Sequence, residues 1–252
     1  MKIFKSLIAC VSTYSKIPMP HVDLDSDDFK YALIFFPLIG AFIGAIEYVL
    51  FYSCEALLLP KMFRVLLMAV IPLIITGGIH VDGFMDTSDA FCSYGDKDRK
   101  LSIMKDPNTG AFAVINFAIF SLLFLAFSYL INTESVVFFC FSFVIARALS
   151  GICAVTIKPA KEEGMLNTIK KNTQLKVVFI VLIFEVVLSL ALVSFIKITV
   201  ALMMLLFSFI SYFTYKSKMM KELNGITGDT LGYYMCITEL ILIIISSVGG
   251  YI

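Results

Sequence analysis

Acidic residues gather in one stretch of this 252-residue sequence, between two apolar segments. Six of the 19 Asp and Glu residues lie between positions 80 and 110. At 3.6 residues per turn, Asp82, Asp86 and Asp89 would fall within about a 60° arc of one helix face. Mg²⁺ prefers oxygen ligands and is commonly held by one or two carboxylates together with substrate phosphates. The three side chains are therefore candidate metal ligands; the alternatives are a solvated acidic loop or a set of helix caps.

Two basic residues that follow the acidic stretch could bind phosphate. Arg99 offers a planar fork of donors and Lys105 a point charge. Carboxylates for a metal ion, with cations for phosphate oxygens, are what phosphoryl transfer requires, because its catalysis is mostly positioning and charge stabilisation. Alternatively, Arg99 is a snorkelling or topology-setting charge, and Lys105 forms a plain surface pair with Asp106.

His80 and a second polar segment, residues 224–232, add further candidates. His80 could be a metal ligand, a general base or a structural histidine. The glycines of residues 224–232 would let backbone N–H groups approach an anion. The segment has no Lys in the Walker position, so it is not a P-loop. Its Asp229 could equally cap the helix that follows.

Arg147 lies inside a long apolar segment. A charge at the centre of a bilayer costs at least about 2.5–3.5 kcal/mol, so an intramembrane ionisable residue is a functional candidate. Glu47, Glu185 and Glu239 fall under the same rule. The alternative is a purely structural ion pair among these residues.

The elements that must position these residues are membrane helices. The sequence is 60% apolar and only 15% charged, whereas soluble domains are about 45–50% apolar and about 25% charged. A net charge of +1 gives no reason to expect nucleic-acid binding. We expect an all-α polytopic membrane protein in which residues 1–252 form a single domain. Seven apolar segments have about the length that crosses a bilayer: 32–52, 63–79, 111–131, 136–157, 177–196, 198–215 and 231–248. The second is interrupted by Pro72 and by Gly77-Gly78, and such broken helices are tolerated where they line a cavity or pack on protein.

The distribution of basic residues predicts an orientation. Residues 2–14 are expected to form a helix in the membrane interface, and the acidic residues 21–30 a solvated linker. With seven spans, sixteen of the 20 Lys and Arg residues fall on the side of the N-terminus and three on the other. The positive-inside rule then places the N-terminus and the polar loops 80–110, 158–176 and 216–230 in the cytoplasm, and the protein in the cell inner membrane.

The stretch His80-x-Asp82-Gly83-x-x-Asp86-Thr87-x-Asp89 resembles the cobalamin synthase family, the adenosylcobinamide-GDP ribazoletransferases. Further motifs similar to those of the family follow in its order, at residues 36–40, 76–78, 103–110, 162–164 and 227–232 and at Glu239. The resemblance covers nearly the whole chain. Asn224, Tyr233, Tyr234 and the Pro107-Asn108 pair depart from the family pattern, so the shape of the pocket is not carried over.

The resemblance implies a reaction. A ribose hydroxyl of α-ribazole, or of its 5′-phosphate, attacks the diphosphate of adenosylcobinamide-GDP, and GMP leaves. Mg²⁺ on Asp82, Asp86 and Asp89 would hold the diphosphate. His80 and Lys105 would join these acids as catalytic residues. The remaining residues implied to bind substrate are Arg99, Asp106, Arg147, Glu162, Glu163, Thr227, Gly228 and Asp229.

Two other functions stay open at this point. A CDP-alcohol phosphotransferase also displaces a nucleoside monophosphate with an Asp-rich membrane helix, but its motif has an Ala-Arg pair that is lacking here. A small cation or metabolite transporter would use intramembrane acids; against it, the acids cluster in a loop, and no internal repeat stands out. Whether the chain forms a homo-oligomer also stays open.

Overall fold

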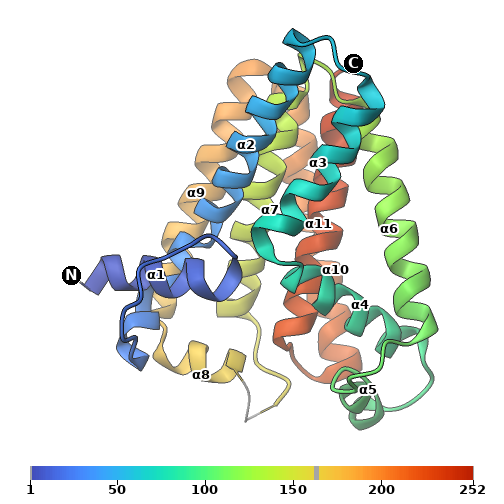
Figure 1. Cartoon of the computed structure of the whole chain (residues 1–252). Helices are drawn as coiled ribbons and strands as arrows, with labels where there is room; N and C mark the ends of the chain where they lie inside the picture. The colour runs from blue at the N-terminus through green and yellow to red at the C-terminus, as the bar shows by residue number, and fades with distance from the viewer. Residues whose placement is uncertain (1, 162–164, 252) are drawn as a thin grey trace.

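The computed structural model describes residues 2–161 and 165–251, and in that part of the chain the regular elements are helices (Figure 1). The single bridge between extended residues in this part pairs Pro159 with Ile226. The expectation of an all-α protein is confirmed. In chain order the elements are α1 (Lys2–Tyr14), the 3₁₀ helix η1 (Ser26–Phe35), α2 (Phe36–Ala56), α3 (Lys61–Thr76), α4 (Ile79–Cys92), α5 (Lys97–Ile103), α6 (Ala111–Leu130), α7 (Val136–Thr156), α8 (Met165–Asn172), α9 (Leu175–Ile196), α10 (Ile198–Leu223) and α11 (Gly228–Gly249).

Six of the described helices are long and apolar enough to cross a membrane: α2, α6, α7, α9, α10 and α11. A seventh crossing involves α3 and α4, which meet at an angle of 95°. The 16 residues of α3 span about 24 Å, so we treat α3 as the crossing helix. The helix α4 lies across the end of the bundle, near α5 (Figure 1). All seven predicted membrane segments are therefore helical.

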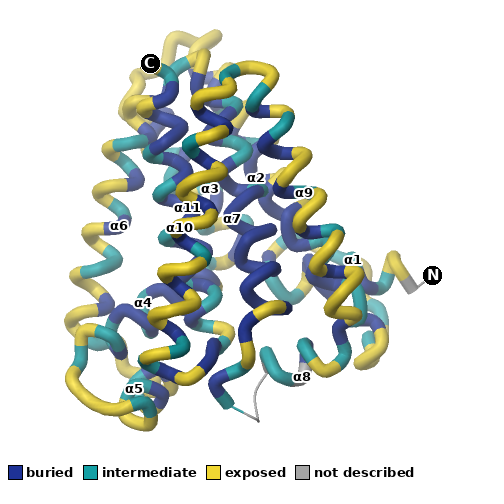
Figure 2. Tube along the Cα trace, turned by 180° about the vertical axis from the view of Figure 1, so that it is seen from behind, coloured by how far each residue is buried: buried dark blue, intermediate teal, exposed yellow. Residues whose placement is uncertain are grey.

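Two helices form the centre of the bundle. Of an 18-residue apolar stretch in each helix, 78% is buried in α7 and 67% in α11. The buried share is only 22% in α6 and 33% in each of α9 and α10. The exposed residues of α6, α9 and α10 face outward along the bundle (Figure 2). The glycines of α2 pack closely on α7, since a side chain on Gly40 would overlap the backbone at Phe143, and one on Gly44 the backbone at Cys140.

The bend between α3 and α4 comes from two glycines. Gly77 has a φ of 65° and Gly78 a φ of 75°, a left-handed conformation that residues with a side chain rarely adopt. Lys16 packs over Gly77 and donates its backbone N–H to the carbonyl of Ile75 at 2.7 Å. The break expected at these glycines is thus confirmed, and the N-terminal segment holds it in place.

The N-terminal region is more structured than expected. The middle of α1 is buried in the bundle through the consecutive residues Ile8, Ala9, Cys10 and Val11, while Ile3 and Phe4 at its start are exposed. The interpretation of residues 21–30 as a solvated linker is wrong for their second half. Asp25 and Asp28 form a capping box at the start of η1, and Asp28 is buried and pairs with Lys5. The acidic side chains are used to start a helix, because each accepts hydrogen bonds from backbone N–H groups there.

Candidate active site

The acidic helix α4 is packed directly on the start of α11 through two glycines. A Cβ on Gly83 would lie 2.8 Å from the Asp229 carbonyl oxygen, and a Cβ on Gly232 would lie 2.8 Å from the His80 carbonyl oxygen. Real Cβ atoms essentially never come this close, so a larger residue at either position would push the helices apart. The acidic motif of α4 and the glycine-containing motif of residues 227–232, which are distant in the sequence, are therefore in contact at their glycines.

This packing brings four carboxylates together. Burial, followed by the charges of Asp82, Asp229 and Asp89, raises the pKa of Asp86 to about 6. The carboxylate of Asp89 lies over Gly110 at the start of α6, where any side chain would collide with it. Among residues 2–161 and 165–251, no three His, Cys, Asp or Glu side chains converge enough to ligate one ion. The carboxylates thus lie close enough to repel one another, and side-chain rotations would be needed to gather them around a cation.

Lys105 and Lys161 are neighbours, and Lys161 lies near the carboxylate of Asp229. Burial, followed by the neighbouring Lys105, lowers the pKa of Lys161, and Asp229 partly offsets this effect. Lys161 is positioned by the backbone: Ile226 N–H donates to the Lys158 carbonyl at 3.0 Å, and Ala160 N–H donates to the Ile226 carbonyl at 2.8 Å. This bridge ties the segment before Lys161 to the loop that precedes α11. Sequence reasoning counted Lys161 only as a topology-setting charge. Its position directly before the Glu162-Glu163-Gly164 motif could have indicated that it belongs to the candidate site.

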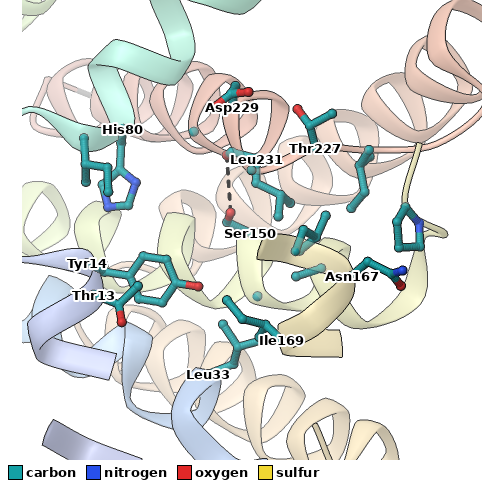
Figure 3. Close-up of a pocket in the computed structure, with 18 of the residues that line it drawn as sticks. Thr13, Tyr14, Leu33, His80, Ser150, Asn167, Ile169, Thr227, Asp229 and Leu231 are labelled. Atoms are coloured by element: carbon teal, nitrogen blue, oxygen red, sulfur yellow. Dashed lines mark hydrogen bonds between the residues drawn. The ribbon is translucent and has the colours of Figure 1, made fainter. Parts of the chain in front are cut away.

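A cavity of about 370 Å³ opens beside these residues and is lined by α1, α4, α7, α8 and the start of α11. Five of the candidate residues line it, namely His80, Lys105, Thr227, Gly228 and Asp229. Tyr14 and Asn167, which sequence reasoning did not single out, line it as well. Figure 3 shows the Tyr14 ring reaching into this cavity, with His80, Asp229 and Thr227 on one side and Leu33 and Ile169 on the other. Ser150 of α7 donates a hydrogen bond to the Leu231 carbonyl at 3.3 Å across its wall (Figure 3).

Asp229 does not cap α11, so that alternative is wrong. Thr227 is the N-cap: its hydroxyl accepts from Thr230 N–H at 3.2 Å, and the Thr230 hydroxyl accepts from Thr227 N–H at 2.9 Å. Asp229 sits one position into the helix, where the N-terminal end of the helix dipole favours a negative charge. Asp229 lines the cavity and lies near the acids of α4.

His80 lies between this cavity and a second one, of about 230 Å³. It is only 7% exposed, and its Nε2 atom is buried without a hydrogen-bond partner among the described residues. Its ring lies 5.4 Å from the Phe36 ring and 6.3 Å from the Tyr14 ring. Burial, followed by the charge of Arg147, lowers the pKa of His80 to about 3, so the neutral imidazole is favoured.

Arg147 lines the second cavity and forms an ion pair. Its Nη1 atom donates to Glu239 Oε2 and to the Phe143 carbonyl, each at 3.0 Å, and the residue is 1% exposed. An ion pair between two of these intramembrane residues, Arg147 and Glu239, is therefore present. Glu47 is completely buried nearby, and neither of its carboxylate oxygens has a partner among the described residues.

The acids of α4, Asp82, Asp86 and Asp89, are not among the residues that line either cavity. The remaining candidates also lie outside both cavities or outside the described residues. Arg99 is exposed on α5. Asp106 is exposed and accepts hydrogen bonds from Asn108, which lowers its pKa, so it holds the turn after α5. Glu162 and Glu163 lie outside the described residues.

Comparisons with known proteins agree with this assembly of motifs. A family model described as cobalamin-5-phosphate synthase matches residues 6–247. A protein of Lachnoclostridium phytofermentans named adenosylcobinamide-GDP ribazoletransferase is 37% identical over 95% of this chain and 92% of its own length. Proteins of the same name from Clostridium botulinum and Clostridium perfringens are 32% and 34% identical over 95% of this chain and over 95% and 96% of their own lengths. No solved structure matches significantly. A match from the first helix to the last, through every motif described above, means that this chain belongs to the cobalamin-5-phosphate synthase family.

Proposed function

We propose that this membrane protein is an adenosylcobinamide-GDP ribazoletransferase. It joins adenosylcobinamide-GDP to α-ribazole, or to its 5′-phosphate, and releases GMP in the assembly of the cobalamin nucleotide loop. The observation that carries the proposal is the contact of α4 with α11 at Gly83 and Gly232, which gathers carboxylates and lysines beside one cavity. The family match runs through both helices, which favours this transferase over a CDP-alcohol phosphotransferase or a transporter.

The reaction displaces GMP from the diphosphate of adenosylcobinamide-GDP. The oxygen of a ribose hydroxyl forms a bond to the phosphorus that carries the aminopropanol arm. The bond from that phosphorus to the bridging oxygen breaks, and the oxygen leaves on GMP. Asp229 is the only carboxylate among the described residues that line the cavity, so we assign it the role of accepting the hydroxyl proton. Lys105 neutralises charge on the phosphate oxygens.

The acids of α4 suit a divalent cation. Burial, followed by the charges of three neighbouring carboxylates, raises the pKa of Asp86, and a cation among these acids would relieve their repulsion. Asp82, Asp86 and Asp89 would hold Mg²⁺, which would supply charge neutralisation for the diphosphate and the leaving GMP. Hard oxygen ligands such as these carboxylates fit Mg²⁺.

The site end of the bundle faces the cytoplasm in this proposal. The helices α4, α5 and α8 lie at one end, and the C-terminus lies at the other (Figure 1). Most Lys and Arg residues fall in the segments at the end that carries α4, α5 and α8, including the basic residues of α5 and α8 themselves. The positive-inside rule then assigns that end to the cytoplasm of the cell inner membrane, where nucleotide-activated substrates are available.

The test is GMP release by purified protein in liposomes. It is measured with adenosylcobinamide-GDP in the presence and absence of α-ribazole 5′-phosphate and of Mg²⁺. Release that needs both supports the proposal, whereas release without the ribazole would indicate a hydrolase. Asp82→Asn should abolish release, while Asp98→Asn, an exposed carboxylate on α5, should retain it. Full activity of Asp82→Asn would contradict the metal-site assignment.

A further inference from the structure

The cavity beside the acidic helix has two chemically different ends. One end is aromatic: the Tyr14 and Phe36 rings are 4.9 Å apart, and both lie against His80. The other end is polar and carries Lys105, Lys161, Thr227 and Asp229. A molecule that fills the cavity must therefore have a planar apolar part and an anionic part.

The aromatic end offers stacking and one hydrogen bond. The Tyr14 and His80 rings are nearly parallel, with an angle of 19° between their planes. The buried Nε2 atom of His80 has no partner among the described residues. A buried polar atom without a partner is costly, and a ring nitrogen of a bound heterocycle would supply one. These features suit a flat heteroaromatic base.

The polar end suits a phosphate. Lys105 and Lys161 lie next to each other, and the proximity of two ammonium groups is unfavourable unless an anion lies between them. The bridge between Ala160 and Ile226 keeps Lys161 at the start of α11. Asp229 lies close enough to Lys161 to interact with its charge and lines the same wall, beside the acids of α4.

The volume limits the choice of substrate. About 370 Å³ is near the lower end of the range for small-molecule sites, about 300–1,000 Å³. It suits a nucleotide-sized molecule, whereas a corrin ring with its side chains is too large to enter. The bulky donor then remains outside the cavity, with only its diphosphate reaching the acids of α4.

We infer that this cavity is the acceptor site and takes a planar heteroaromatic ribonucleoside 5′-phosphate, with the base against Tyr14, Phe36 and His80 and the 5′-phosphate on Lys105 and Lys161. This inference rests on the proposed function, because that function supplies the nucleoside acceptor. It assigns Lys161 a role in selecting the phosphorylated acceptor. The ribose then lies between the two ends, within reach of Asp229.

The experiment compares two acceptors, α-ribazole 5′-phosphate and α-ribazole, in the GMP-release assay. Lys161→Met removes the charge and keeps most of the side-chain length. It should raise KM for the phosphorylated acceptor about tenfold, the effect of losing roughly 1.4 kcal/mol of binding free energy. KM for α-ribazole and for adenosylcobinamide-GDP should not change. Lys158→Met, an exposed lysine three residues earlier, is the matched control and should leave all three values unchanged.

Three outcomes would overturn the inference. A raised KM for adenosylcobinamide-GDP would show that the lysines hold the donor diphosphate instead. Equal increases for both acceptors would show that Lys161 does not read the 5′-phosphate. An unchanged KM for the phosphorylated acceptor would exclude a role for Lys161 in its binding. Absence of GMP release by the wild-type protein would instead defeat the proposed function, so the two failures are distinguishable.

A binding measurement tests the aromatic end without catalysis. Titration of α-ribazole 5′-phosphate into the detergent-purified protein, without donor, should give binding that Tyr14→Leu weakens and Tyr14→Phe retains. The melting temperatures of both variants are compared with that of the wild type, so that a folding defect is recognised. Equal affinity for Tyr14→Leu and the wild type, or no binding to well-folded wild-type protein, would contradict the assignment of the base.

Discussion

Gly83 of α4 lies so close to Asp229 of α11 that a Cβ on Gly83 would be 2.8 Å from both the Cα atom and the carbonyl oxygen of Asp229. The contact is between backbones, so no flexible side chain can move away to relieve it. It fixes the distance between the acidic helix and the loop that carries Thr227, Gly228 and Asp229. Together with the contact of Gly232 with the His80 carbonyl, it sets how α4 and α11 pack at the site.

Gly83→Ala should therefore lower both stability and GMP release. In an ordinary helix, Ala is more favourable than Gly by up to about 1 kcal/mol. Here the added methyl group should cost about 1–3 kcal/mol by overpacking. Thermal unfolding in detergent, monitored together with GMP release, tests this. A variant at least as stable and active as the wild type would show that α4 and α11 are not held at this distance.

The charge of Asp86 should destabilise the metal-free protein at neutral pH. Its pKa is raised from 3.8 to about 6 in the folded protein, so the folded state binds the proton more tightly than the unfolded state. The unfavourable contribution is fully present above about pH 6 and disappears as the pH falls below 3.8. At pH 7.5 without Mg²⁺, Asp86→Asn should melt a few degrees higher than the wild type, and the difference should shrink towards pH 4.

The control for this experiment is Asp98→Asn, which removes an exposed carboxylate of α5 and should not change the pH dependence. A pH-independent difference between Asp86→Asn and the wild type would mean that the carboxylate charge is not the cause. Lower stability of Asp86→Asn at pH 7.5 would contradict the repulsion among the four acids.

Magnesium should make the wild type more stable than Asp86→Asn, which reverses their order in the metal-free protein. A ligand that binds only the folded state raises its stability by an amount that grows with its concentration. Saturating Mg²⁺ should raise the melting temperature of the wild type but not that of Asp86→Asn. The apparent Mg²⁺ affinity should weaken as the pH falls through about 6, because protons then compete for Asp86. Equal Mg²⁺ stabilisation of wild type and variant would place the metal elsewhere.

The ion pair between Arg147 and Glu239 should matter for stability as a unit. Arg147→Met leaves a buried carboxylate without its partner, which costs about 3–5 kcal/mol when the partner of a buried charge is removed. The double variant Arg147→Met with Glu239→Leu should recover most of this loss. Chemical unfolding of the three variants measures the free energies. A normal KM for both substrates in the double variant would rule out the substrate-binding role expected for Arg147.

The orientation of the bundle can be tested with a native cysteine. Cys92, at the end of α4, is the exposed one of the six cysteines, all of which lie in the described part of the chain. A membrane-impermeant maleimide should label it in inside-out vesicles and not in right-side-out vesicles, with Cys92→Ser as the control. Labelling only in right-side-out vesicles would place the site end of the bundle outside the cytoplasm.

The sequence by itself determined the membrane helices, because a helix can cross the bilayer when it is long and apolar enough, and both are local properties of the sequence. It also determined the break at Gly77-Gly78 and the helical face of Asp82, Asp86 and Asp89, which depend only on neighbouring residues. The family motifs indicated candidate residues of the site, but not the contacts between them. Sequence reasoning allowed Asp229 to be the cap of its helix, and only the structure shows that Thr227 fills that position.

The tertiary structure alone decided which distant residues meet. Lys161 joins the site because a backbone bridge from residues 158–160 to Ile226 carries it there, and no periodicity in the sequence encodes such a pairing. Tyr14 lines the cavity because α1 folds back onto the bundle, and Arg147 pairs with Glu239 because α7 packs on α11. These contacts join residues that lie 65 or more positions apart in the sequence, so they depend on how whole helices pack and not on local propensity.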